Sequence, residues 1–302
     1  MQFKKPTFWD YQKISFWSVL LFPFSIIYFS IIWVIKVTSI FTSYKKMPIP
    51  VICVGNIYIG GTGKTPLVRE IFNITKSLGK NPAFIKKYHA YLSDEIKMLK
   101  DKGKVFTNHK RYKSILSSVS NNHDVAILDD GFQDFSIKPD FSILCFNSNQ
   151  MIGNGLLIPS GPLRESLRAI LRADCIIING PKNLEFEKKL FKTIQNKKLH
   201  IFYSKYKIKN IEKFKNKEIT AFAGIGNPSN FFNLLRKNNL DIKETFSFPD
   251  HHEYSKKDFE KIIKDRSTKI ITTEKDYYRM NEDQKQNCEY VKVDLEIENK
   301  EK

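Results

Sequence analysis

One stretch near the start of the chain constrains the fold more than any other: a glycine-rich turn between an apolar run and a helical pattern. The apolar run, 49–54, has the composition of a buried strand, and apolar side chains recur at helical spacing after residue 66. The turn between them reads GNIYIGGTGKTP over 55–66. Strand, glycine-rich turn, Gly-Lys-Thr and helix in this order are the context of a phosphate-binding P-loop. The sequence therefore predicts a nucleotide phosphate site at this turn.

Each residue type of this turn has a chemical reason to be there. Glycines let backbone N–H groups approach a phosphate closely, and the helix N-terminus adds positive potential. Lys64 would reach the β- and γ-phosphates, and the Thr65 hydroxyl would ligate Mg²⁺. The residues expected to contact ATP are Tyr58, Ile59, Gly60, Gly61, Thr62, Gly63, Lys64 and Thr65.

The turn departs from the strict pattern, which has glycine at the position of Tyr58. The paired Gly60 and Gly61 are closer to deviant Walker loops, but those carry a second lysine where this chain has Ile59. The alternative interpretation is a glycine-rich turn with an incidental lysine. The flanking strand and helix patterns favour the P-loop.

A second motif, DVAILDDGFQ over 124–133, is an apolar run that ends in two carboxylates. This is a Walker B arrangement, and it predicts that Asp129 and Asp130 hold Mg²⁺ directly or through water. Alone it could be an exposed acidic turn, but it follows Lys64 by about 65 residues. Apolar runs alternating with helix-length segments predict an α/β fold with a mostly parallel sheet.

The N-terminal region contains an uncharged stretch of 22 residues, 14–35. As a helix it would span roughly 33 Å, about the hydrocarbon thickness of a bilayer. Trp17 and Trp33 lie near its ends, as interface anchors do. A membrane anchor is favoured, either spanning the bilayer or dipping into one leaflet, over a buried core helix or a signal peptide. Basic residues flank both ends, so only the nucleotide site places the rest of the chain in the cytoplasm.

Composition adds less. The 302 residues can form one large or two modest domains, and the net charge of +18 suits an anionic partner such as phospholipid, a phosphorylated substrate or nucleic acid. No nucleic-acid-binding motif supports the last of these. The four cysteines form no Cys-x-x-Cys pair and are expected as reduced thiols in a cytosolic domain.

Several polar groups follow predicted strands of the second half, where open α/β sheets place their sites. They include PDHHEY over 249–254 and TTEKD over 272–276. His251 and His252 could bind a metal, but no third ligand has the required spacing. Gly224-x-Gly226 resembles half a dinucleotide fingerprint, although a tight strand-to-helix turn is favoured. Residues 295–302 are expected to be frayed.

Five motifs together resemble the tetraacyldisaccharide 4′-kinase family, the lipid A 4′-kinases of Gram-negative bacteria. They are GN…GGTGKTP (55–66), DDGFQ (129–133), GNG…PSGPLRE (153–165), FPDHH (248–252) and TEKD (273–276). The resemblance runs in order from about residue 8 to 294 and includes the apolar N-terminal stretch.

The resemblance implies transfer of the ATP γ-phosphate, with Mg²⁺, to the 4′-hydroxyl of a tetraacylated glucosamine disaccharide 1-phosphate, giving lipid IV-A. It implies a protein of the inner membrane with its catalytic domain on the cytoplasmic face, membrane lipid as a partner and no obligate protein partner. The expected parts are a membrane-associated helix and linker (1–46), a P-loop kinase core (47–198) and a smaller α/β subdomain (199–302).

The resemblance also implies site residues. The family's catalytic Asp matches Asp94 and its catalytic His matches His251, with His252 as the fallback. We hypothesise that Asp94 orients the imidazole or takes the acceptor proton directly. Residues matching the sugar-headgroup or phosphate contacts are Gln133, Arg164 and Glu165; for the last two, the alternative is a surface ion pair.

The chain departs from the family around the predicted catalytic Asp. Lys86-Lys87-Tyr88-His89 replaces Arg-Gly-Tyr-Gly, and Ser93 and Ile96 replace the Gly and Pro that flank the Asp. The alternative interpretation of Asp94 is therefore a helix cap. Two other functions remain open from the residues alone: a membrane-anchored deviant-Walker ATPase switch, and a kinase for a small molecule that is not a lipid.

Overall fold

The computed structural model describes residues 5–41, 46–89, 93–195, 199–264 and 267–299. These residues form two compact units. Among the described residues, the core unit comprises 6–41, 46–89, 102–195, 199–205 and 295–299, and the second unit comprises Lys5, 93–101, 206–264 and 267–294. The segment 93–101 thus groups with the second unit, whereas the sequence placed it in the kinase core. The three-part division at 46/47 and 198/199 stays a prediction.

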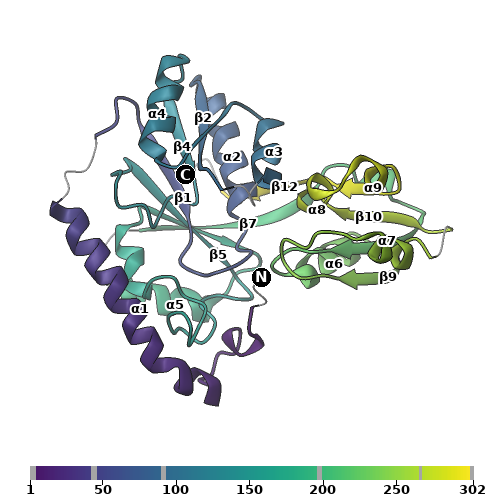
Figure 1. Cartoon of the computed structure of the whole chain (residues 1–302), viewed down its shortest axis with the longest axis horizontal. Helices are drawn as coiled ribbons and strands as arrows, with labels where there is room; N and C mark the ends of the chain where they lie inside the picture. Colours follow the sequence, from purple (N-terminus) through teal and green to yellow (C-terminus); the bar gives the residue numbers. More distant parts are fainter. Residues whose placement is uncertain (1–4, 42–45, 90–92, 196–198, 265–266, 300–302) are drawn as a thin grey trace. The chain divides into compact units, whose positions relative to one another are not determined.

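The core unit is built on a mostly parallel sheet of eight strands (Figure 1). In sheet order these are β12 (Val293–Ile297), β7 (His200–Ile208), β6 (Cys175–Asn179), β5 (Phe141–Asn147), β1 (Val51–Gly55), β4 (Val125–Asp129), β2 (Pro82–Lys87) and β3 (Val105–Asn108). From β7 to β3 every neighbouring pair is parallel. The predicted fold class is confirmed. Parallel neighbours bring the carboxyl ends of β1, β4 and β5 to one edge, which positions the site.

The edge strand β12 was not predicted. Residues 295–302 were expected to be frayed, but Leu295 and Ile297 are buried in β12. Glu298 N donates to Tyr203 O, and Lys209 N donates to Lys292 O, so β12 runs antiparallel to β7. Alternation of apolar and charged residues in VDLEI carries the strand signal. For residues 295–297 the expectation of a frayed end was wrong, because it weighted charge over this alternation. Residues 300–302 lie outside the described part of the chain.

The helices of the core unit follow the predicted pattern. They are α1 (Phe16–Phe41), α2 (Lys64–Ser77), α4 (Arg111–Ser120) and α5 (Leu184–Ile194), with 3-10 turns η1 (Thr7–Trp9) and η3 (Leu167–Arg172). α2 contacts β1, β2 and β4, and α4 contacts β2 and β3. The Asn183 side chain caps α5 by accepting a hydrogen bond from Phe186 N.

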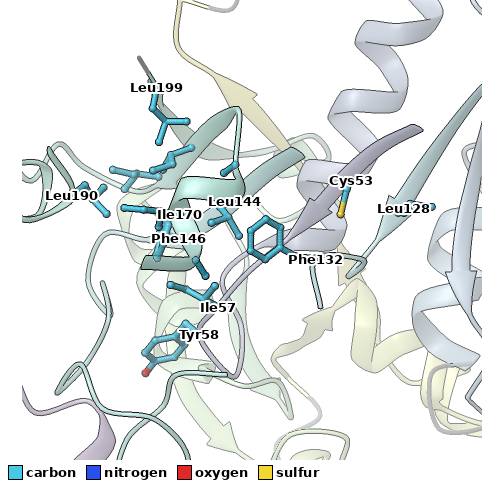
Figure 2. Packing of buried hydrophobic residues seen from close by; sticks show 14 of the residues in the cluster. Cys53, Ile57, Tyr58, Leu128, Phe132, Leu144, Phe146, Ile170, Leu190 and Leu199 are labelled. Atoms are coloured by element: carbon cyan, nitrogen blue, oxygen red, sulfur yellow. The ribbon is translucent and has the colours of Figure 1, made fainter. Parts of the chain in front are cut away.

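One hydrophobic cluster fills the core unit (Figure 2). The strands that supply it are buried along almost their whole length, as expected for strands covered on both faces. Figure 2 shows Ile57 and Tyr58 of the P-loop in this cluster together with Phe132 from the turn after β4. The N-terminal part of the predicted phosphate-binding loop is thus anchored in the core.

Helix α1 is not a core helix. An 18-residue window within its segment Phe16–Ser39 has a mean hydropathy of 2.3, and only 11% of this window is buried. By length and composition the helix could cross a membrane. Both of its tryptophans, Trp17 and Trp33, are more than half exposed. These are the properties of a membrane-associated helix.

The buried stripe of α1 is polar and packs on the loop that precedes η3. Ser25 Oγ donates to Leu157 O at 2.9 Å, and Ser18 Oγ accepts from Asn154 Nδ2 at 3.0 Å. Tyr28 donates to Arg164 O at 3.0 Å. The side of α1 that faces protein is therefore fixed by hydrogen bonds to the loop that carries two predicted substrate residues.

The second unit has its own four-stranded parallel sheet, in the order β11 (Glu289–Val291), β10 (Lys269–Thr273), β8 (Glu218–Ala223) and β9 (Asp241–Ser247). Its helices are α3 (Ser93–Lys100), α6 (Pro228–Lys237), α7 (Lys256–Ile262), α8 (Glu274–Arg279) and α9 (Glu282–Gln286), with a 3-10 turn η4 (Ile211–Lys213). Packing of α3 on α8 ties the segment 93–101 to this unit. The charged stretch after β10 is helix α8, capped by Thr273.

Candidate active site

The P-loop conformation depends on two glycines and one asparagine. Gly60 and Gly63 have φ of 111° and 93°, values that residues with a Cβ rarely adopt. Asn56 is buried inside the turn, and its Nδ2 donates to Tyr58 O at 2.5 Å and to Thr62 Oγ1 at 2.9 Å. These bonds hold the two arms of the turn together and leave Lys64 as the first residue of α2.

Lys64 lies beside the carboxylate that follows β4. Its Nζ is 4.0 Å from Asp130 Oδ1, and Arg164 Nη1 donates to both oxygens of Asp130 at 2.9 and 3.0 Å. Burial would raise the pKa of Asp130, but Lys64 and Arg164 outweigh it and hold the pKa at about 2. Asp130 also has a φ of 56°, unusual for a residue other than glycine. The result is two cations gathered on one ionised carboxylate.

The other predicted metal ligand, Asp129, is deeply buried at the end of β4. Its Oδ2 is 2.5 Å from Lys86 Nζ in β2. Its Oδ1 is buried and has no hydrogen-bond partner within the described ranges. A buried carboxylate oxygen without a donor suits a cation or a water bound to one, so the residues fit Mg²⁺. Among the described residues no three His, Cys, Asp or Glu side chains form a metal site by themselves. Thr65 and the nucleotide would complete the ligands.

The other predicted ATP contacts differ in exposure. Gly61 is exposed; Ile59, Gly60, Gly63 and Thr65 are half-buried, and Thr62 is buried. Tyr58 is fully buried in the hydrophobic cluster, and its hydroxyl is hydrogen-bonded to Asp10. The side chain of Tyr58 therefore faces away from the mouth of the P-loop, and only its backbone could meet a nucleotide.

The three predicted substrate residues form one hydrogen-bonded group. Gln133 Nε2 donates to Glu165 Oε1 at 3.2 Å and to Asn56 O at 2.9 Å. Arg164 Nη1 lies 3.3 Å from Gln133 Oε1. Arg164 and Glu165 do not form an ion pair with each other; each binds another partner. The group is thus joined to the P-loop through Asn56 and to the predicted metal ligand Asp130 through Arg164.

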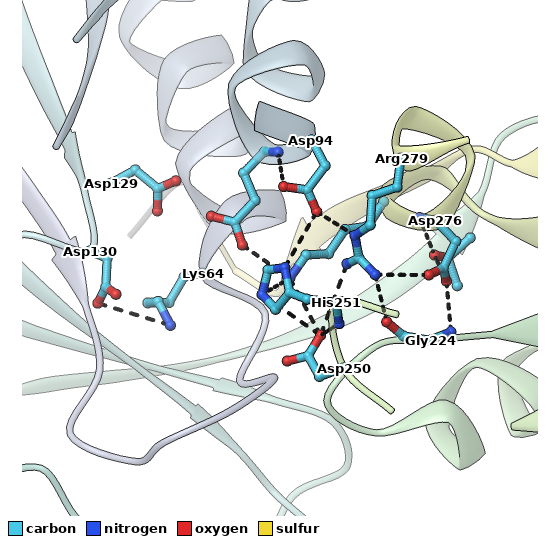
Figure 3. Close-up of polar contacts among 12 residues, drawn as sticks. Lys64, Asp94, Asp129, Asp130, Gly224, Asp250, His251, Asp276 and Arg279 are labelled. Carbon is cyan, nitrogen blue, oxygen red and sulfur yellow. Dashed lines mark hydrogen bonds and ion pairs between the residues drawn. The ribbon is translucent and has the colours of Figure 1, made fainter. Parts of the chain in front are cut away.

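In the second unit, the predicted catalytic pair is brought together by a residue that the sequence did not single out. Asp94 is buried in the first turn of α3, and Arg279 Nε donates to its Oδ2 at 2.7 Å. Arg279 Nη1 also donates to Asp276 Oδ1 at 3.1 Å and to Gly224 O at 2.8 Å (Figure 3). The side chain of Ser93, considered as a helix cap, lies outside the described part of the chain. Asp94 is an ion-pair partner, not only a capping residue.

His251 lies beside Asp94, with 3.9 Å between Nδ1 and Asp94 Oδ2. Its backbone N donates to Gly224 O at 3.2 Å, and its φ is 59°. Strained backbone of this kind is frequent at functional sites. The Gly224-x-Gly226 stretch is therefore a strand-to-helix turn whose backbone holds His251 and Arg279.

The surroundings of His251 favour its neutral form. Its Nε2 is 3.3 Å from Lys275 Nζ, and Lys275 is also 3.1 Å from Glu95. Burial first, and then the charge of Lys275, lower the pKa of His251 below its usual value. By contrast, His252 Nε2 contacts Asp258 Oδ2 at 3.1 Å and is turned to α7. Of the two histidines, His251 is the one beside the buried carboxylate.

Two site residues were missed by the sequence. Lys86 was noted only as a departure from the family pattern, yet it is the ion-pair partner of Asp129. Arg279 lies three residues after Asp276, a spacing that puts both on one face of a helix. That signal was in the sequence, but the motif considered there ended at Asp276.

Comparisons with known proteins agree with the geometry. The family described as tetraacyldisaccharide-1-P 4′-kinase matches residues 17–90 and 86–302. The tetraacyldisaccharide 4′-kinase of Pelagibacter ubique (strain HTCC1062) is 44% identical over 98% of this chain and 95% of its own length. That of Francisella tularensis subsp. novicida (strain U112) is 29% identical over 96% of this chain and 98% of its own length.

A solved structure gives the same result. The crystal structure of LpxK from Aquifex aeolicus in complex with ATP aligns with a TM-score of 0.74 at 26% identity, covering 94% of this chain and 96% of that one. A P-loop, an acidic strand end and a match over nearly the whole length leave the nucleotide switch and the small-molecule kinase without support. The chain belongs to the tetraacyldisaccharide 4′-kinase family and is a kinase.

Proposed function

We propose that the protein transfers the γ-phosphate of ATP to the 4′-hydroxyl of a tetraacyldisaccharide 1-phosphate, giving the 1,4′-bisphosphate lipid IV-A. The observation that carries this proposal is the gathering of Lys64 and Arg164 on Asp130 at the mouth of the P-loop. Phosphoryl transfer requires fixed positive charge where negative charge moves between the donor and acceptor oxygens. Family membership supports the identity of the acceptor.

The P-loop residues 58–65 would bind the ATP phosphates. Backbone N–H groups of the turn and the N-terminus of α2 face the phosphates, and Lys64 neutralises charge on the transferred group. Asp129, Asp130 and Thr65 would hold Mg²⁺, which when bound supplies further charge neutralisation to the phosphates. For Asp129 to do so, its Oδ1 must be used or Lys86 must release Oδ2.

Asp94 and His251 would deal with the proton of the acceptor hydroxyl. An imidazole can take this proton only when it is neutral, and burial together with Lys275 favours the neutral form of His251. Asp94 would orient the ring and stabilise the imidazolium that forms. Their 3.9 Å separation is longer than a hydrogen bond, and such distances commonly shorten when substrate binds.

Helix α1 would place this chemistry at a membrane. We propose the cytoplasmic face of the inner membrane, because ATP is cytoplasmic and because an acylated acceptor resides in lipid. The exposed apolar surface of α1 and its two interfacial tryptophans support insertion. Whether the helix spans both leaflets does not affect the chemistry.

The test is to supply γ-labelled ATP, Mg²⁺ and tetraacyldisaccharide 1-phosphate in detergent, and to identify the labelled product. We expect labelled lipid whose label survives mild acid, because acid cleaves the anomeric phosphate and spares a 4′-phosphate. Labelled inorganic phosphate without labelled lipid would contradict the proposal and favour an ATPase. Label lost in mild acid would place the transfer at the wrong oxygen.

A further inference from the structure

A second group of cations lies apart from the P-loop, around the buried carboxylate of Glu165. Arg172 Nη1 and Nη2 donate to its two oxygens at 2.8 Å each, and Lys36 Nζ is 3.6 Å from Oε2. Glu165 is 3% exposed, whereas the side chains of Lys36 and Arg172 are 40% and 30% exposed. Two cations share one carboxylate, so the group keeps one uncompensated positive charge that solvent or a ligand can reach.

Two aromatic rings hold these cations in place. The guanidinium of Arg172 lies 4.4 Å from the ring centre of Phe132 and 5.1 Å from that of Phe135. Lys36 Nζ lies 5.8 Å from the ring centre of Phe135. Cation–π contacts and the bidentate pair with Glu165 reduce the side-chain freedom that binding an anion would otherwise remove. The group is therefore preorganised for an anion.

A continuous series of contacts joins this group to the phosphate site. In order, the series runs Lys64, Asp130, Arg164, Gln133, Glu165 and then Lys36 with Arg172. All of these residues belong to the core unit. We call this series of contacts the polar track. Lys64 lies at one end of it, and Lys36 and Arg172 lie at the other.

The acceptor of the proposed reaction has the same two-ended chemistry. Its reacting 4′-hydroxyl and its existing 1-phosphate lie on opposite ends of a disaccharide. With the 4′-hydroxyl beside Lys64, the sugar would extend along the polar track and its phosphate would meet the free charge at the other end.

The position of Lys36 on α1 fits a lipid headgroup. Lys36 is the first charged residue after the uncharged stretch 14–35 and lies on the same helix as the exposed apolar surface. A basic residue at the end of such a stretch lies at the level of lipid headgroups. We propose that Lys36 and Arg172 bind the phosphomonoester that the acceptor already carries, and so select acceptors phosphorylated at the 1-position. This inference rests on the proposed function.

The experiment compares two acceptors, tetraacyldisaccharide with and without its 1-phosphate, with wild type and Lys36→Ala. We expect wild type to have a KM for the phosphorylated acceptor at least about 10-fold lower than for the other, as one charge-assisted contact allows. Lys36→Ala should lose most of this preference while the KM for ATP stays unchanged. Lys36→Arg should restore it, because the charge is kept.

Lys46→Ala is the matched control. Lys46 is exposed, follows the same helix and carries the same charge, so its removal tests general attraction to anionic membranes. Arg172→Gln provides a second variant that should lower the same preference for the 1-phosphorylated acceptor.

Three outcomes decide between the explanations. Equal use of both acceptors by wild type would overturn the inference and leave the proposed kinase activity intact. Lys36→Ala could instead lose the same amount of transfer activity on both acceptors and bind more weakly to vesicles containing phosphatidylglycerol. That result would also overturn the inference, because Lys36 would then bind membrane lipid in general. No transfer to either acceptor by wild type would instead overturn the proposed function.

Discussion

The proposed active site has two parts that are built in opposite ways. In the core unit, the phosphate site comes from one continuous turn, whose shape depends on glycine backbone and on Asn56. In the second unit, the catalytic group comes from side chains of α3, the turn after β9 and α8, joined by Arg279. The first site is local in sequence, and the second exists only after the unit has folded.

Their charge balance differs as well. The core unit gathers cations in excess around Asp130 and Glu165, which suits binding of phosphate groups. The second unit pairs Arg279 with buried Asp94 and Asp276 and lowers the pKa of His251, which suits a proton acceptor. Variants in the two parts should therefore fail in different ways. Those in the core unit should lose charge neutralisation, and those in the second unit should lose geometry or proton affinity.

The largest effect is expected for Lys64→Ala. Loss of the P-loop lysine removes the charge nearest to the transferred phosphate, and the transfer rate should fall by at least about 10³-fold. The measurement is the rate of labelled lipid formation, with Lys80→Ala, an exposed lysine beyond the same helix, as control. Substantial activity in Lys64→Ala would remove the P-loop from the account.

The next effect is on stability, in the second unit. Arg279→Met leaves Asp94 and Asp276 buried without their cation, and should lower the free energy of unfolding by about 3 kcal/mol. Urea unfolding measures this change. Arg279→Lys should cost less, and adding Asp94→Asn to Arg279→Met should recover part of the loss. A neutral Arg279→Met variant would show that the ion-pair network does not hold this unit together.

Asp94→Asn and His251→Ala should each lower turnover by about 10²-fold, the usual size of a lost general base. His252→Ala is the matched control, since its ring is turned to Asp258, and it should change turnover by less than about threefold. If His252→Ala were the damaging variant, the assignment of the two histidines would be reversed.

The smallest effect is on pH dependence. The pKa of His251 is lowered by burial and by Lys275, so the ring stays neutral below the pH at which a free histidine gains its proton. Lys275→Met removes one cause, so the pKa of His251 should rise. As the solution is acidified, activity should then begin to fall at a higher pH than in wild type. Lys275→Arg keeps the charge and should leave the acidic limb of the pH profile unchanged. The pH profile of kcat measures both; an unchanged limb in Lys275→Met would mean that His251 does not set it.

The sequence predicted the core unit well because its signals are local. The P-loop, the strand ending at Asp129 and the alternating apolar runs each depend on residues close in sequence, and the observed sheet follows them. Arg164 and Glu165 were candidates from their place in a loop rich in Gly and Pro, and Gln133 was added by family resemblance. Their arrangement as one hydrogen-bonded group was not predictable, because it depends on the loop after β5 folding back on β4.

The sequence said less about the second unit because its contacts are long-range. Asp94 and Arg279 are 185 residues apart, and no pattern joins them. Nor did composition indicate that 93–101 leaves the core unit, since the segment lies between two core strands. Strand β12 was missed for a different reason: its short alternating pattern was outweighed by the charge of the residues that follow.

The most direct test of the two-part account separates ATP binding from transfer in Asp94→Asn and His251→Ala. The dissociation constant for ATP is measured by equilibrium binding, and the transfer rate by a single turnover with saturating ATP and labelled γ-phosphate. The account predicts a dissociation constant within about threefold of wild type and a transfer rate about 10²-fold lower. Weakened ATP binding with a normal rate at saturation would contradict it, because Asp94 and His251 would then belong to the nucleotide site.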